Sequence, residues 1–481
     1  MAKESKHTSS SFLVAGGQVL SLGIRFVTNI ALAWFLMPAD FGVAAIVGTV
    51  LVGMSLFSDV GIRDSVIRHE SGDSDSFNVS AQLLQVVRGV ILYIVLLLLG
   101  PLLAGFYDVE ILDECLMLAG LSLVFEGMIS TRFYIFERNV DVMPGLVFDF
   151  VSQLAVTIVI VVLAYFYRSV WVLMFSYPIG TFVKLLISHY YANNFINPFK
   201  ADVAYVKEII SFGKWILLST LFSFVVIHAD TLIIAKLVDI SSVGIYQLAG
   251  TFAALMFGVA ASLTEKIVYP AIAEASRGNV DDMSGELDKV LQGFMPVILA
   301  GTLFVFAVSP LFFHYLYREE YHQAGYLSQV LVIMFWLMTV YAILNRLAIS
   351  FNHPHVAAKV SAVTAVARVT LGLLGFYLFG MNGFILGLTA GSLLGSFAML
   401  RWLESSQNIH HTYLIKQTVP LVAIIIFYFA ASYYFNNQLL FAWIAAVLIC
   451  LGISVYLYQT YQHFIPVALD RIRTRKAEVA D

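Results

Sequence analysis

Long apolar stretches follow one another along this sequence, and each is long enough to cross a lipid bilayer as a helix. Open strands cannot satisfy their backbone hydrogen bonds in lipid. Hydrophobic residues make up 60% of the 481 residues and charged residues only 12%, whereas soluble domains carry about 25% charged residues. The sequence therefore predicts an all-α integral membrane protein. Taking about 20 residues per span, we place about 14 transmembrane helices, at residues 11–37, 41–62, 78–103, 109–131, 143–166, 169–191, 211–236, 243–266, 288–312, 323–350, 357–379, 382–403, 413–435 and 438–462.

The charges between the spans indicate the side of the membrane on which each connection lies. Positive residues accumulate in the cytoplasmic connections of membrane proteins. If the N-terminus is cytoplasmic, most of the 27 Lys and Arg residues lie on the cytoplasmic side. The outer connections then hold only Arg168, Lys236 and Arg318. We therefore expect a multi-pass protein with both termini in the cytoplasm.

A short internal similarity points to two related halves. The segment PADFGVAAIVGTVLVG at 38–53 aligns with ISSVGIYQLAGTFAAL at 240–255, and the alignment pairs Gly42 with Gly244. In both copies a span ends, a short outer connection follows, and a new span begins in the same direction. Parallel repeats of this kind are related by an axis along the membrane normal, and transport sites lie near the interface of the repeats. Chance similarity between two apolar helices is the competing explanation.

Four positively charged residues lie near the middle of predicted spans: Arg25, Arg88, Lys184 and Arg368. A charge at the bilayer centre costs about 2.5–3.5 kcal/mol on insertion scales, so such residues usually face a wet cavity lined by protein. A guanidinium is a planar fork of donors that suits phosphate. We therefore predict that these four cations bind a negatively charged substrate.

Each of these cations also has a structural interpretation. Arg25 would be satisfied by a buried acid, for which Asp149 and Asp230 are candidates. The same alternative holds for Arg88 and Arg368. Lys184 could instead extend its ammonium group to the membrane surface.

Acidic residues inside the spans are candidates for ion coupling. Asp230 lies two residues from His228, and both groups change charge near physiological pH when their pKa values are shifted. Asp149 is a further candidate for a proton or ion site. Packing of polar side chains between helices is the alternative for all three. Asp40 follows Pro38 at the start of a span, where its carboxylate can cap the helix.

Motifs of enzymes are missing from the sequence. It has no GxSxG, HExxH, paired CxxC or glycine-rich phosphate loop. The two cysteines, Cys115 and Cys450, lie in apolar surroundings without metal or disulfide spacing. The pair Asp281-Asp282 lies in a short polar connector. We therefore expect no catalytic site, metal or cofactor.

Four segments, taken in order, resemble one known family. They are PADFG at 38–42, FSDVGIRDSVIR at 57–68, FGKWILLS at 212–219 and DTLIIAKLVDISSVGIYQLA at 230–249. Together they look like the oligosaccharide flippases of the polysaccharide biosynthesis (Wzx-type) family. That family belongs to the multidrug/oligosaccharidyl-lipid/polysaccharide (MOP) exporter superfamily. The resemblance covers nearly the whole chain, and it depends on the order and spacing of the segments.

The resemblance implies two six-helix lobes in a V-shaped arrangement followed by two further helices. On this chain the lobes would be residues 1–197 and 198–408, the added pair 409–462 and a cytoplasmic tail 463–481. Relatives place an arginine after glycine in the first helix in a cationic cavity for diphosphate, and Gly23-Ile24-Arg25 is similar. Asp40 is similar to an acidic residue at the outer end of that helix.

The resemblance also implies a function. Members of the family move undecaprenyl-diphosphate-linked oligosaccharide repeat units of exopolysaccharide, capsule or O-antigen across the bacterial inner membrane by alternating access. A proton or sodium ion would be the coupling ion, and a polymerase and a chain-length regulator would be partners. The alternatives are a multidrug exporter of the same superfamily and a membrane-embedded polysaccharide polymerase or ligase. The former handle cations, and the latter typically carry a large outer loop.

Overall fold

A computed structural model describes residues 20–21, 23–139, 141, 143–192, 201–269, 271–272, 283–351, 353–407, 412–435 and 438–461. The predicted tail 463–481, the pair Asp281-Asp282 and the first part of the predicted span 11–37 lie outside these residues. Every regular element among the described residues is a helix. The all-α prediction is therefore confirmed.

The chain divides into two compact units, Met1–Gln247 and Leu248–Asp481. The first unit contains a short apolar helix at Gly23–Ala33 and then α2 (Pro38–Phe57), α3 (Ile62–Arg68), α4 (Asp75–Tyr107), α5 (Ile111–Met128), η1 (Thr131–Phe133), α6 (Tyr134–Arg138), α7 (Met143–Tyr167), α8 (Val170–Ala192) and α9 (Val203–Leu237). The boundary between the units falls within α10 (Ile240–Ala253). The second unit continues with α11 (Leu255–Leu263), the π-helix η3 (Thr264–Val268), α13 (Met283–Gln292), α14 (Met295–Leu316), η4 (Glu319–Tyr321), α15 (Gln323–Ser350), α16 (Pro354–Gln407), α17 (Thr412–Tyr434) and α18 (Gln438–Tyr461).

Ten of the described helices are long and apolar enough to cross a membrane, or 11 if α10 and α11, which meet at 45°, form one bent span. Within the described residues, each predicted span overlaps one or more helices. The counts differ partly because α16 joins the predicted spans 357–379 and 382–403. In addition, α5 is not counted as a span because it carries three acidic residues. The predicted span 11–37 is not counted either, because only its part Gly23–Ala33 is described as a helix.

The long helix α16 is two helices joined at a sharp turn. Phe379 and Gly380 leave the helical backbone conformation, and Gly380 has a φ of 63°, which glycine adopts without steric cost. Glycine then recurs at every fourth position, at 383, 387, 391 and 395. A Cβ added to Gly387 would overlap the carbonyl oxygen of Leu371. The two halves of α16 thus pack backbone to backbone, as small residues allow in membrane helices.

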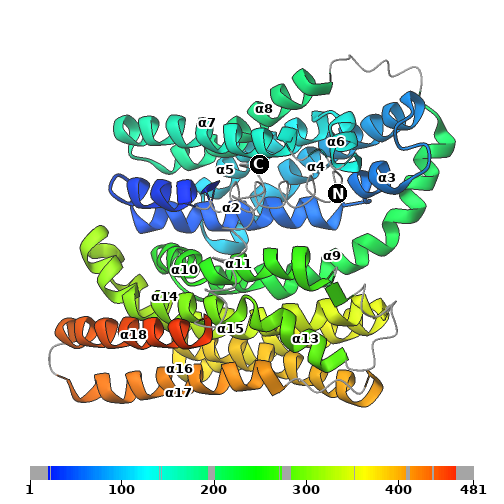
Figure 1. Ribbon diagram of the computed structural model, residues 1–481. Helices are drawn as coiled ribbons and strands as arrows, with labels where there is room; N and C mark the ends of the chain where they lie inside the picture. The colour runs from blue at the N-terminus through cyan, green and yellow to red at the C-terminus, as the bar shows by residue number, and fades with distance from the viewer. Residues whose placement is uncertain are drawn as a thin grey trace, which may run out of the picture. The chain divides into compact units, whose positions relative to one another are not determined.

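Within the first unit, α4 packs on α5, α5 on α8 and α8 on α7, while α2 lies against α5 and α8 (Figure 1). Buried side-chain amides of α4 form hydrogen bonds with the end of α5. The side-chain nitrogen of Gln82 donates to the carbonyl of Gly127 at 3.2 Å, and that of Gln85 to the carbonyl of Ile129 at 3.0 Å. These bonds satisfy carbonyl groups that the end of a helix would otherwise leave without partners.

The helix α9 packs against α2 and α4 (Figure 1). The hydroxyl of Thr220 donates to the carbonyl of Leu56 at 2.9 Å, and the rings of Phe57 and Phe224 meet edge to face at 4.8 Å. Only the part Thr220–Leu237 qualifies as a membrane span. The lobe boundary that we place at residue 198 stays a prediction.

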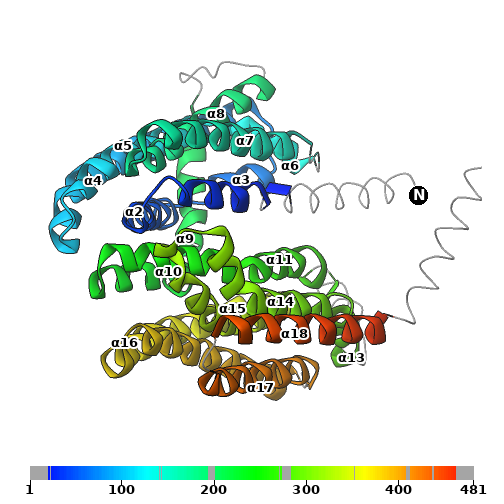
Figure 2. The same cartoon turned by 90° about the vertical axis from the view of Figure 1, so that its left-hand side faces the viewer.

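Within the second unit, α14 packs against α15 and α18, and α15 packs along α16 (Figure 2). Trp336 of α15 is 1% exposed, and its indole nitrogen donates to the hydroxyl of Thr418 on α17 at 3.0 Å. Buried indole groups are found with a hydrogen-bond partner of this kind. This bond helps to fix α17 against the core of the unit.

The first turns of α2 and α10 contact each other through two glycines. A Cβ added to Gly42 would overlap the carbonyl oxygen of Ile240, and a Cβ added to Gly244 would overlap that of Pro38. The contact is reciprocal, because the sequence alignment pairs Pro38 with Ile240 and Gly42 with Gly244. Both helix ends therefore need glycine at this position.

Candidate functional site

A stripe of polar side chains runs along α7 in the first unit. Asp149, Gln153 and Thr157 are spaced four residues apart, so they share one face of the helix. The hydroxyl groups of Thr28 and Thr157 lie 3.0 Å apart, and the amide nitrogen of Gln153 lies 3.4 Å from the Thr157 hydroxyl. Thr28 belongs to the helix Gly23–Ala33, so the stripe continues onto that helix.

Arg25 lies one turn before Thr28 on the same helix and is exposed. Residues three positions apart lie on neighbouring parts of one helix face. Within the described part of the chain, no hydrogen bond or ion pair of the Arg25 guanidinium is found. Among the described residues, Arg25 is thus an exposed cation without a protein partner, three residues from Thr28 of the polar stripe.

Lys184 and Asp149 form an ion pair at the N-terminal end of the stripe on α7. The ammonium nitrogen of Lys184 on α8 lies 3.2 Å from a carboxylate oxygen of Asp149. It also lies 5.1 Å from the centre of the Phe148 ring, in the range of a cation–π contact. The structure thus brings together two residues that the sequence singled out separately.

Arg88 makes contacts at the C-terminal end of α2. Its Nε donates to the hydroxyl of Ser58 at 2.9 Å, and a terminal nitrogen donates to the carbonyl of Ser55 at 2.6 Å. The C-terminal end of a helix carries partial negative charge and unsatisfied carbonyl groups. Arg88 therefore stabilises the end of α2 in this structure.

The fourth predicted cation, Arg368, lies in the second unit and is 2% exposed. Its guanidinium donates to the hydroxyl of Ser392 in the second half of α16 and lies 3.8 Å from the sulfur of Met334 on α15. A buried cation must be compensated by hydrogen bonds or by opposite charge. Arg368 joins α15 to both halves of α16.

The acidic residue Asp230 also has defined partners. The hydroxyl of Tyr246 on α10 donates to its carboxylate at 2.7 Å, and the backbone N–H of Thr231 donates at 2.9 Å. The ring of His228 lies 5.6 Å from that of Phe224. Tyr246 was not singled out from the sequence, because one tyrosine among 24 gives no signal until its helix is placed.

Acidic residues cap both helix ends that meet at Gly42 and Gly244. Asp40 accepts a hydrogen bond from the backbone N–H of Met37 at 2.8 Å. Asp239 accepts from the N–H and the hydroxyl of Ser242 at 3.0 and 2.8 Å, and these bonds lower the pKa of its carboxyl group. A carboxylate is favourable at a helix N-terminus, where the dipole is positive.

A comparison with known protein families identifies the family of this chain. The sequence profile described as "Polysaccharide biosynthesis protein" matches residues 31–326, which is more than half of the chain. No curated protein sequence matches.

Solved structures match over most of the chain. The lipid II flippase MurJ in an inward closed conformation has a TM-score of 0.73 at 13% identity and covers 94% of this chain and 100% of that chain. An inward-facing MATE multidrug transporter of the MOP superfamily has a TM-score of 0.63 at 14% identity, over 83% of this chain and 95% of that chain. At such identities the likeness shows the fold alone. It confirms the helical MOP-type fold that the resemblance implies.

Proposed function

Because this chain belongs to the polysaccharide biosynthesis protein family, we propose that it is a flippase for undecaprenyl-diphosphate-linked oligosaccharide repeat units. It moves them from the inner to the outer leaflet of the bacterial inner membrane. The observation that carries the proposal is the exposed Arg25 guanidinium beside a polar stripe in an otherwise apolar helix bundle. A diphosphate is the group that such a fork of donors binds best.

In this proposal Arg25 makes the first contact with the diphosphate. Lys184 is the second cation, because an incoming diphosphate competes with Asp149 for its ammonium group. Arg88 and Arg368 are the remaining predicted substrate cations, and each would be released by breaking its present contact, with Ser55 for Arg88 and with Ser392 for Arg368. For the coupling ion we assign Asp230, with His228 two residues before it, as the proton site. Asp149, once released from Lys184, is the further candidate for a proton or a sodium ion.

We assign the contact between α2 and α10 to an outer gate, with Asp40 as its cap. On the predicted topology, with both termini cytoplasmic, these helix ends lie at the outer surface. Separation of the two glycine-packed helix ends would open the gate, as alternating access requires.

The alternative functions fit less well. The multidrug transporters share the fold, but four cations within predicted spans disfavour a cationic substrate. A polymerase or ligase would need catalytic residues on an outer connection. The outer connection between the halves of α16 is only the turn around Gly380. Transport without catalysis is therefore the better proposal.

Replacing Arg25 with alanine tests the proposal directly. We expect the arrival of lipid-linked oligosaccharide in the outer leaflet to fall about tenfold, because a hydrogen bond to a charged group contributes about 1.5–3 kcal/mol. Arrival is measured as accessibility of the sugar to a membrane-impermeant reagent. Arg401→Ala is the matched control, since Arg401 is exposed and its nearest acidic partner is Glu404 at 3.9 Å on the same helix. Normal arrival at normal protein level in the Arg25 variant would refute the assigned role.

Replacing Asp230 with asparagine tests proton coupling. Asparagine still accepts the hydrogen bond from Tyr246, but it cannot ionise. We expect transport in proteoliposomes to lose its dependence on a pH gradient. The dependence is measured by comparing flipping with and without an imposed gradient. An unchanged dependence would exclude Asp230 as the proton site, and dependence on sodium alone would point to the other ion.

A further inference from the structure

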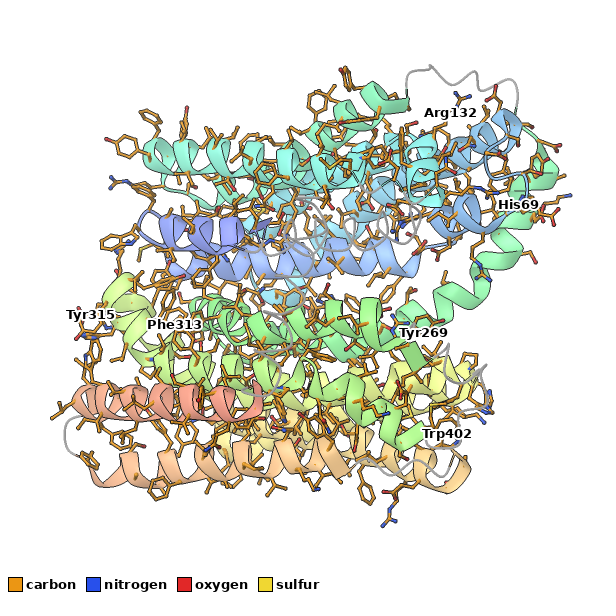
Figure 3. All side chains as sticks on the ribbon, viewed as in Figure 1. His69, Arg132, Tyr269, Phe313, Tyr315 and Trp402 are labelled. Atoms are coloured by element: carbon orange, nitrogen blue, oxygen red, sulfur yellow. The ribbon has the colours of Figure 1, made fainter. Side chains whose placement is uncertain are left out.

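A small pocket in the first unit lies apart from the residues assigned above. It has a volume of about 240 Å³ and lies among α3, the start of α4 and the first half of α9. Figure 3 labels His69, which lies beside α3 and α9. The lining combines one cation, one anion, a hydroxyl group and apolar surface, from Ser65, Arg68, His69, Phe77, Glu208 and Ile209.

The His69 ring is held in this pocket through both of its nitrogens and by stacking on a second ring. The backbone N–H of Ser71 donates to its Nδ1 at 3.0 Å, so Nδ1 is an acceptor and the other nitrogen carries the proton. That nitrogen, Nε2, lies 2.9 Å from a carboxylate oxygen of Glu208. The ring also stacks on Phe77 at 4.6 Å. Glu208 is thereby held at the pocket as an oriented carboxylate.

The connection after α3 is shaped by a second, separate cation. The guanidinium of Arg138 donates to the carbonyls of Val66, Ile67 and His69, at 3.2, 3.1 and 2.5 Å. These bonds hold the backbone that carries Arg68 and His69. The wall of the pocket is therefore held in place by hydrogen bonds within the protein.

Ser65 supplies an independent sign of a ligand. The residue is only 7% exposed, and its hydroxyl has no hydrogen-bond partner within the described structure. A buried hydroxyl left without a partner costs about 1–3 kcal/mol, so native proteins rarely keep one. A bound polar group in the pocket would satisfy it.

The charges around the pocket decide the chemistry of that group. Arg68 lines the pocket and offers a guanidinium with five N–H donors, more than a single partner can use. Arg68 and Ser65 together suit a phosphate, whereas Glu208 repels an anion and suits an ammonium group. A ligand with a phosphate and a primary ammonium close together matches both ends.

We propose that this pocket binds the phosphoethanolamine headgroup of a phospholipid, with the phosphate on Arg68 and Ser65 and the ammonium on Glu208. Val203 and Ile210, in the first turns of α9, are 66% and 46% exposed, as expected where a helix lies in the membrane interface. The bound lipid connects α3 to the first half of α9. On the predicted topology it belongs to the cytoplasmic leaflet.

The test is native mass spectrometry of the full-length protein in detergent, with palmitoyl-oleoyl phosphatidylethanolamine, phosphatidylglycerol or phosphatidylcholine added separately. We expect phosphatidylethanolamine to bind at least about tenfold tighter than the other two, because the loss of one charge-assisted hydrogen bond has about this effect. Phosphatidylglycerol lacks the ammonium, and the quaternary nitrogen of phosphatidylcholine cannot donate to Glu208. Soluble phosphoethanolamine carries the same two charges but no acyl chains, so we expect it to bind more weakly than the lipid.

Variants separate the two ends of the pocket. Arg68→Ala should weaken phosphatidylethanolamine binding about tenfold, and Arg68→Lys should restore part of it. Glu208→Gln still accepts the bond from His69, and it should bind phosphatidylethanolamine and phosphatidylglycerol equally. The control is Arg318→Ala with Glu320→Gln, which removes an Arg–Glu pair of 2.6 Å elsewhere. Equal binding of the three lipids by the native protein, or unchanged selectivity in both pocket variants at a normal thermal unfolding midpoint, would overturn the proposal.

Discussion

Valine in place of Gly387 should prevent the two halves of α16 from packing together, with loss of most of the folded protein. The carbonyl of Leu371 occupies the space of a Cβ at this position, and the same holds between Gly375 and Gly383. Backbone atoms cannot move aside as the end of a side chain can. We therefore expect a loss of stability at or above the upper end of the range of about 1–3 kcal/mol that overpacking causes.

The yield of monodisperse protein after extraction and the thermal unfolding midpoint in detergent measure this effect. The matched control is Gly452→Val, since a Cβ at Gly452 in α18 meets nothing within 4 Å. The control should behave like the native protein. If both variants were equally stable, the two halves of α16 would not be in backbone contact.

The fold could be predicted from the sequence because bilayer thickness and backbone hydrogen bonding leave few choices. Even the turn inside α16 has a sequence signal, as the predicted spans 357–379 and 382–403 leave Gly380 between them. The glycines at 383, 387, 391 and 395 were also visible as a repeat of small residues. Their spacing is a known signal of close helix contact, and it could have predicted how α16 packs.

The partners of the site residues could not be predicted in the same way. Asp149 was a candidate partner for Arg25, and the structure pairs it with Lys184. Which cation an acid meets depends on how neighbouring helices are rotated about their axes, and hydropathy does not fix that rotation. The contacts of Arg88 with the end of α2 depend equally on where α2 ends in space.

The polar stripe on α7 could be predicted only in part. The spacing of Asp149, Gln153 and Thr157 is readable in the sequence, but its importance appears only when Thr28 of another helix meets it at 3.0 Å. A polar face of this kind in an apolar helix indicates a neighbour that is polar or wet. The polar face of α7 therefore indicates which face the helix that carries Thr28 and Arg25 packs against.

Alanine in place of Gly244 should stop transport while the protein still folds. Its Cβ would overlap the carbonyl of Pro38, so the first turns of α2 and α10 could not meet. A penalty of about 1–3 kcal/mol on the packed arrangement lowers its population about 5- to 150-fold. If this contact is the outer gate, the gate stays open and the alternating cycle is interrupted.

Flipping of lipid-linked oligosaccharide and hydrogen exchange of residues 38–42 and 240–244 measure the two consequences. Gly42→Ala should have the same effect, because the contact is reciprocal and its Cβ would overlap the carbonyl of Ile240. Gly250→Ala on the same helix is the control, as a Cβ there meets nothing within 4 Å. Full transport by both gate variants, with faster exchange at these helix ends, would show that the cycle does not need the contact and would remove the gate assignment.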